Sequence, residues 1–169
     1  MKRRLKSTEG SKRANRSEAG FSLIELLVVV AVILIIAAIA IPNYIQSKMR
    51  ANEASAVQNL RNISTAELFY SSTYGIGFST SLIQLSGTGV NPDQNNAGTI
   101  DEVLAGGNKS GYVFTYSPLT TGSLGHVLTY SVNADPLTSS TGQRHFYSDQ
   151  TCVIRVNIAV SAGPTDVPI

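Results

Sequence analysis

The apolar positions of this chain fall into three patterns along its length. Residues 21–41 form one run that is apolar except at Ser22 and Glu25. Residues 44–74 place apolar side chains at helical spacing with polar positions between them. Beyond residue 111, short segments rich in aromatic and β-branched residues are separated by turn residues. These patterns predict a long apolar helix, an amphipathic helix and a small antiparallel sheet.

The apolar run is long enough to span a membrane. At about 1.5 Å per residue, residues 21–41 form a helix about 31 Å long, which matches the hydrocarbon core of a bilayer. Few basic residues follow the run closely, and seven precede it: Lys2, Arg3, Arg4, Lys6, Lys12, Arg13 and Arg16. The positive-inside rule therefore predicts a cytoplasmic N-terminus and an outward-facing C-terminal part.

The positive charge of the chain belongs to its first 20 residues. These residues hold seven of the 13 basic and two of the 11 acidic side chains, so the formal charge falls from +2 to −3 without them. Nucleic acid is not expected as a partner, because phosphate binding needs clustered Lys and Arg. The nearest approach to a cluster is Lys48, Arg50 and Arg61, which we interpret as a solvated helix face.

Glu25 argues against two ordinary interpretations of the apolar run, a secretory signal and a plain anchor. A secretory signal has an apolar region of about 7–15 residues and a small-x-small cleavage site. Residues 38–40 spell such a site, so a binding module secreted by cleavage after Ala40 is the alternative from a different class. The length of the run and its acidic residue argue against it. A plain anchor fits the length, but a carboxylate within a span costs several kcal/mol and indicates a function.

Residues 20–26 (GFSLIEL) and the apolar run after them resemble the cleavage and methylation signature of type IV pilins and type II secretion pseudopilins. That signature is a basic leader, a glycine, a methylated apolar residue and an acidic residue five places into the mature chain. Gly20, Phe21 and Glu25 match it. The resemblance is strong over residues 14 to 75 and looser beyond.

The resemblance implies that a prepilin peptidase cuts between Gly20 and Phe21 and methylates the new amine of Phe21. That amine and the Glu25 carboxylate would both lie at membrane depth, where they offset each other's desolvation within one chain or between subunits. We hypothesise that Glu25 recruits the amine of a neighbouring subunit and sets the register of a filament. The implied partners are further copies of the chain, the peptidase, and an inner-membrane assembly platform with its ATPase.

Pro42 follows the apolar run and removes one backbone donor. It predicts a kink in a helix that continues, the alternative being a helix end at the membrane surface. The amphipathic part is predicted to turn one face to the sheet. That face holds Ala56, Leu60, Ile63 and Tyr70, broadened by Val57 and Leu68.

Residues 75–110 form a Gly-, Ser- and Asn-rich connection with a predicted turn of helix at residues 101–104. The resemblance implies that this segment is exposed on the surface. Four of its residues fall at offsets 1, 3, 5 and 12 of a calcium loop: Asn91, Asp93, Asn95 and Glu102. The match is weak, because Asn96 stands where glycine is wanted and Pro92 intrudes, so a polar loop without cofactor is favoured.

Four strands are predicted, at residues 112–117, 127–132, 144–147 and 152–157, with residues 117–125 as turn material. The only cysteine, Cys152, is predicted to pack in the core as a small strand residue. Many members of the family that the chain resembles close the C-terminal region with two cysteines. A disulfide-bounded loop is therefore not expected, which leaves packing or a metal to stabilise this end.

Enzymatic patterns are absent from the sequence. His126 and His145 lie outside metal-ligand spacing, and there is no phosphate-binding glycine motif or nucleophile elbow. We expect an α+β pilin-like fold and a structural function as a type IV pilus subunit, with a secretion pseudopilin or minor pilin as the alternative. Before assembly the subunit would lie in the inner membrane, and afterwards in an extracellular pilus or periplasmic pseudopilus. The expected divisions are 1–20 leader, 21–41 transmembrane helix, 42–74 amphipathic helix, 75–110 connection and 111–169 sheet.

Overall fold

The computed structural model describes residues 20–87, 91–122 and 124–169. The predicted leader, except for Gly20, lies outside the described residues. The chain divides into two compact units, Met1–Ala40 and Ile41–Ile169. Each unit is considered by itself below.

One helix, α1, runs from Leu23 to Tyr74 and includes Pro42. The helix continues past the proline, so the alternative of a helix end there is wrong. The kink itself stays a prediction.

The part of α1 in the first unit is strongly apolar and exposed among the described residues. In its most apolar window no residue is buried, and it is the one helix among the described residues that is long and apolar enough to cross a membrane. A soluble protein's core helix of this composition would be covered by its own chain. The first unit therefore needs a bilayer or other molecules to cover it.

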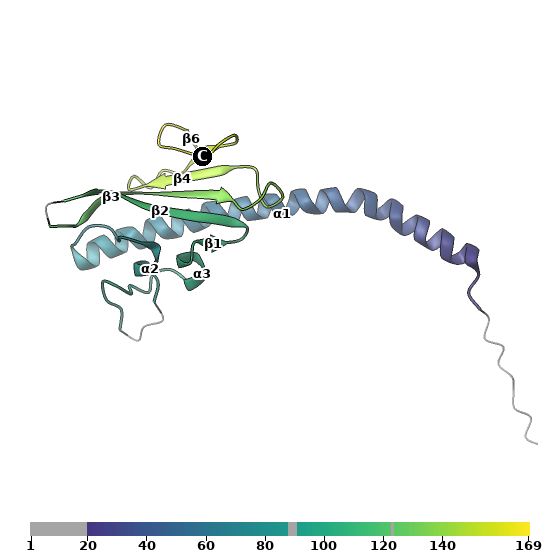
Figure 1. The fold of residues 1–169 in the computed structure, drawn as a ribbon, viewed down its shortest axis with the longest axis horizontal. Coiled ribbons are helices and arrows are strands. Elements are labelled where there is room, and N and C mark those ends of the chain that lie inside the picture. Colours follow the sequence, from purple (N-terminus) through teal and green to yellow (C-terminus); the bar gives the residue numbers. More distant parts are fainter. Residues whose placement is uncertain (1–19, 88–90, 123) are drawn as a thin grey trace, which may run out of the picture. The chain divides into compact units, whose positions relative to one another are not determined.

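The second unit contains a six-stranded antiparallel sheet in which each strand pairs with the next along the chain (Figure 1). The strands are β1 (Asn108–Lys109), β2 (Tyr112–Thr121), β3 (Val127–Pro136), β4 (His145–Asp149), β5 (Arg155–Asn157) and β6 (Val167–Pro168). The sequence predicted about four strands. The two additional ones, β1 and β6, have two residues each, which is too short to produce an alternating pattern.

The strand β2 is longer than predicted, because residues 117–121 extend the pairing with β3 and do not form a turn. Pro118 lies in this extension, and the register shifts between Pro118 and Thr120. β1 pairs only with Tyr112 and Val113, so the far end of β2 has one neighbour. Proline is tolerated on such an edge, because no ladder hydrogen bond is lost there.

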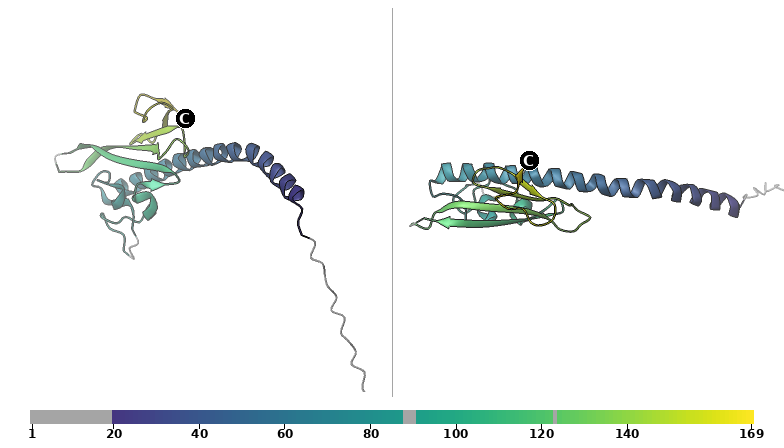
Figure 2. Two further views of the ribbon diagram at one scale, coloured as in Figure 1. Left: turned by 45° about the vertical axis from the view of Figure 1, so that its right-hand side comes forward. Right: turned by 90° about the horizontal axis from the view of Figure 1, so that it is seen from above.

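The second half of α1 covers one face of the sheet (Figure 2), and the core lies between them. The predicted core positions of α1 are confirmed as buried: Ala56, Leu60, Ile63 and Tyr70. Val57 packs against them, but the prediction for Leu68 was wrong, because this side chain is 52% exposed. Leu68 lies about 100° around the helix from Glu67, which takes the buried position.

The connection between α1 and the sheet is partly built into the core. It forms α2 (Leu82–Leu85) and α3 (Glu102–Ala105), and Asp101 caps α3 by accepting a hydrogen bond from the Leu104 N–H. The predicted turn of helix is thus confirmed. Three leucines are buried here: Leu82, Leu85 and Leu104. The connection is therefore exposed only in part, because these leucines belong to the hydrophobic core.

Candidate functional site

The predicted cleavage site lies directly before the start of α1. Gly20, Phe21 and Ser22 are exposed and not helical. These residues can adopt an extended conformation without any unfolding of the helix. The structure thus leaves the bond between Gly20 and Phe21 accessible.

Glu25 caps the helix that it belongs to. The backbone N–H of Ser22 donates a hydrogen bond of 2.9 Å to Glu25 Oε2. Ser22 precedes the first helical residue, Leu23, and Glu25 is the third helical residue. This is the glutamate half of a capping box, in which the side chain reaches back to the N-cap amide. The negative charge also lies near the positive end of the helix dipole.

The capping contact changes the interpretation of Glu25. The sequence indicated that this carboxylate has a function beyond anchoring, and the structure gives it a partner in its own chain, the N–H of Ser22. The signal was present in the sequence, because Ser22 and Glu25 have the Ser-x-x-Glu spacing of a capping box. The pairing of Glu25 with a neighbouring subunit's amine stays a prediction.

The calcium candidates are not gathered into one group. Asp93 Oδ1 accepts hydrogen bonds from the backbone N–H groups of Asn95, at 2.8 Å, and Asn96, at 2.9 Å. Glu102 lies on another element, in the first turn of α3. In the described ranges, three or more His, Cys, Asp or Glu side chains nowhere converge as metal ligands would. The favoured prediction of a polar loop without cofactor, and the weak calcium alternative that includes Asn91, both stay untested.

Cys152 does not pack in the core, and that prediction was wrong. The residue is exposed, has a φ of 59° and lies in the turn between β4 and β5. The preceding turn is held by Asp149 Oδ1, which accepts hydrogen bonds from the N–H and the hydroxyl of Thr151. Strand β5 therefore begins only at Arg155.

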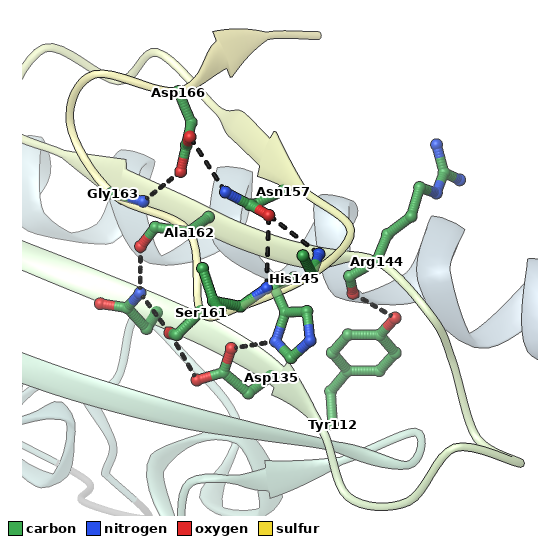
Figure 3. Close-up of polar contacts among 12 residues, drawn as sticks. Tyr112, Asp135, Arg144, His145, Asn157, Ser161, Ala162, Gly163 and Asp166 are labelled. Carbon is green, nitrogen blue, oxygen red and sulfur yellow. Dashed lines mark hydrogen bonds and ion pairs between the residues drawn. The ribbon is translucent and has the colours of Figure 1, made fainter.

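Hydrogen bonds close the C-terminal segment where a disulfide could have done so (Figure 3). Asp166 accepts from Asn157 Nδ2 at 3.0 Å and from the Gly163 N–H at 2.8 Å. Asn133 Nδ2, on β3, donates to the carbonyl of Ala162 at 2.6 Å and to the Ser161 hydroxyl at 3.0 Å. The loop between β5 and β6 is thereby attached to the centre of the sheet.

Asp135, His145 and Ser161 have the residue types of a hydrolase triad but not its geometry (Figure 3). Asp135 Oδ1 lies 2.6 Å from His145 Nδ1, and Asp135 Oδ2 accepts a hydrogen bond of 2.9 Å from the Ser161 hydroxyl. The serine thus bonds to the carboxylate, whereas a nucleophile must bond to the histidine that activates it. The cluster orders the loop after β5.

Glu53 ties α1 to the connection between β3 and β4. Its carboxylate accepts hydrogen bonds from the N–H groups of Gln143 and Arg144, and Arg144 Nε lies 2.7 Å from Glu53 Oε2. Burial opposes the charge of Glu53, but these hydrogen bonds and the guanidinium outweigh it, so the pKa of Glu53 lies below its ordinary value.

Glu67 ties α1 to the segment after it. Its carboxylate accepts hydrogen bonds from the N–H and the hydroxyl of Ser79, at 2.9 and 2.5 Å. The carbonyl of Ser79 in turn accepts a hydrogen bond from the Tyr116 hydroxyl. Glu67 is fully buried, and this burial raises its pKa despite the hydrogen bonds from Ser79.

Comparison with known proteins identifies the N-terminal segment. Residues 15–41 match the family described as the prokaryotic N-terminal methylation motif. The chain is 49% identical over 55 residues to the type IV major pilin protein PilA of Myxococcus xanthus, an alignment that covers 32% of this chain and 25% of that protein. It is 37% identical over 113 residues to a fimbrial protein of Pseudomonas aeruginosa, covering 57% of this chain and 73% of the relative.

The chain is also 53% identical over 38 residues to the type IV wide pilus major component PilA4 of Thermus thermophilus. This alignment covers 22% of this chain and 29% of that protein. No solved structure matches the chain. The chain thus spans about a quarter of the length of the Myxococcus protein and nearly three quarters of the Pseudomonas protein.

Proposed function

Because the chain belongs to the type IV pilin family, we propose that it is a structural subunit of a type IV pilus, assembled through α1. One observation carries the proposal above others: the methylation motif leads directly into a helix whose apolar side chains are uncovered in the folded chain. A bilayer covers such a helix before assembly. The helices of other subunits cover it afterwards.

Processing would convert the membrane-inserted precursor into a subunit that can assemble. A prepilin peptidase cuts between Gly20 and Phe21 and methylates the Phe21 amine, which keeps its positive charge. The exposed, non-helical backbone at the cleavage site supports this step. Cleavage also removes the basic leader, so the mature N-terminus carries one cation four positions before Glu25.

The location follows from the charge distribution of the precursor. The basic leader stays in the cytoplasm, α1 crosses the inner membrane, and the second unit faces outward. The assembly platform and its ATPase would extract the mature chain into an extracellular filament. Function in this family is structural, and the geometry at Asp135 and His145 offers no nucleophile.

Glu25 has two roles in this proposal, and two variants separate them. Glu25→Gln keeps the acceptor that caps the Ser22 amide, because Gln also serves in a capping box, but it removes the charge. Glu25→Ala removes both. If the carboxylate recruits the Phe21 amine of a neighbour, both variants should be cleaved normally and both should yield few or no filaments.

Two measurements test this expectation. Mass spectrometry of the mature chain should find N-methylated Phe21 in the wild type and both variants, and electron microscopy of sheared filaments gives the yield. Normal filament yield from Glu25→Gln would show that capping, not charge, is what assembly requires. A mature chain that begins at Ile41 would contradict the pilin function altogether and favour the secreted module.

A further inference from the structure

A cleft opens between α1 and the connection of β3 to β4, close in sequence to the end of the apolar run. It has a volume of about 1040 Å³. Gln46, Met49 and Arg50 line it from α1, and Thr138, Ser139 and Arg144 line it from the opposite side. The cleft lies wholly within the second unit, and the Glu53 contacts to residues 143 and 144 hold its two walls together.

The cleft presents two guanidinium groups. Arg144 uses its Nε on Glu53 and is 45% exposed. In the part of the chain that the structure describes, neither the two terminal nitrogens of Arg144 nor the exposed Arg50 has a hydrogen-bonded or ion-paired partner. Two arginines against one glutamate leave a formal charge of +1 at these residues. Such guanidinium groups favour a phosphate, to which each offers parallel N–H donors.

The α1 wall of the cleft begins one turn beyond the predicted end of the membrane span. Ile41 and Gln46 belong to one uninterrupted helix, so five residues separate them by about 7.5 Å along its axis. The polar layer of a bilayer leaflet is about 5–8 Å thick beyond the hydrocarbon. Tyr44, which is 68% exposed, has the character of the aromatic residues that mark this layer. From the next turn, Arg50 can extend its side chain back toward the headgroups.

We propose that this cleft binds the headgroup of an anionic phospholipid, with the phosphate between Arg50 and Arg144. The inference rests on the proposed function, because it applies to the precursor while α1 is in the membrane. The charge of +1 at the cleft complements the single negative charge of a headgroup such as phosphatidylglycerol. Met49 supplies an apolar surface beside the phosphate position for the glycerol end of the lipid. The bound lipid would hold the second unit against the membrane until assembly extracts the chain.

The test uses the full chain reconstituted in nanodiscs of phosphatidylcholine, alone or with increasing fractions of phosphatidylglycerol. Hydrogen exchange of peptides covering residues 46–53 and 137–144 reports the occupancy of the cleft. Both peptides should become protected only as phosphatidylglycerol is added. For Arg50→Gln, half-maximal protection should need about a fivefold higher fraction of the anionic lipid, the usual effect of losing one cation at a membrane surface.

Arg61→Gln is the matched control, because Arg61 is exposed on the same helix but outside the cleft. It should leave the protection unchanged. An equal shift for Arg61→Gln, or equal protection in pure phosphatidylcholine, would overturn the site. Protection by inorganic phosphate added to phosphatidylcholine discs would show that free phosphate, not lipid, is the ligand.

Flotation of the same samples distinguishes failure of the lipid site from failure of the proposed function on which it rests. A chain that floats with lipid but shows no response to phosphatidylglycerol contradicts the lipid site alone. A chain that does not float at all contradicts the membrane-inserted precursor, and the lipid site with it.

Discussion

Glu53 and Glu67 are both buried on the face of α1 that packs against the rest of the second unit, but their environments act on their charges in opposite directions. Glu53 has a guanidinium and two N–H groups as partners, which lower its pKa. Glu67 accepts hydrogen bonds from Ser79, and burial raises its pKa despite them. A lowered pKa in the folded state stabilises the fold above the ordinary value near 4.5, and that contribution is lost as the pH falls through the folded pKa. The raised pKa of Glu67 destabilises the fold at pH values above the folded pKa, and this cost is lost as the pH falls toward 4.5.

Glu67→Gln should therefore be at least as stable as the wild type at neutral pH. Glutamine can still accept from the Ser79 N–H, and it carries no buried charge. The difference should shrink as the pH falls through the folded pKa of Glu67 toward 4.5, because the wild-type carboxyl becomes neutral in the same interval. Thermal unfolding midpoints of the mature chain in detergent, measured across this range, provide the check.

Glu53→Gln is the matched variant with the opposite expectation. It should be less stable than the wild type at neutral pH, by about 2 kcal/mol, since the ion pair with Arg144 is lost and one side of that pair is in solvent. This deficit should diminish as the pH falls. If the stability difference from the wild type changed with pH in the same direction for both variants, the opposite pKa shifts of Glu53 and Glu67 would be contradicted.

Among the elements, those that could be predicted have a recognisable pattern of apolar residues over several positions. The apolar and amphipathic parts of α1 repeat their pattern over many turns. β2 begins with the alternation of residues 112–116, whereas β3 and β4 were recognised from their aromatic and β-branched residues between turn residues. β1 and β6 have two residues each and exist only because a neighbouring strand pairs with them. The polar closure of the C-terminal segment was not predicted, because Asn133 and Ala162 meet across 29 residues of sequence.

In the candidate site, too, residues that form a local pattern could be predicted, whereas contacts between distant residues could not. Gly20, Phe21 and Glu25 lie within six residues and could be recognised from spacing alone. The cap on Ser22 could have been recognised too. The cleft of Arg50 and Arg144 could not, because it is produced by the packing of distant elements.

Gly142 offers a test of how the connection after β3 fits onto the sheet. A Cβ at this position would overlap the ring and hydroxyl of Tyr112, which donates a hydrogen bond to the Arg144 carbonyl. Gly142→Ala should displace the tyrosine and cost about 1–3 kcal/mol. Gly163→Ala is the control, since nothing lies within 4 Å of its Cβ position. Denaturant unfolding measures the free energy of unfolding of both variants. Equal losses would show that the Tyr112 ring can move aside at no cost.

For the whole molecule, the buried core and the helix proposed for assembly lie in different units. The buried hydrophobic core extends from Ala56 to Ala162, entirely within Ile41–Ile169. A chain lacking residues 1–40 should therefore remain folded, become soluble without detergent, and unfold within a few degrees of the full chain. Circular dichroism on heating tests this. An unfolded or aggregated product would mean that the apolar part of α1 contributes to the fold.

The hydrogen-bonded closure around Asn133, Asn157 and Asp166 has a consequence for folding and for mechanics. Since the chain has a single cysteine, the second unit needs no oxidant to reach its native state, and a reductant cannot loosen it. Closure by hydrogen bonds is also reversible, whereas a disulfide opens only through exchange with a thiol. Under tension, the C-terminal segment could detach and return without any covalent step, which would give a fibre of such subunits an elastic element.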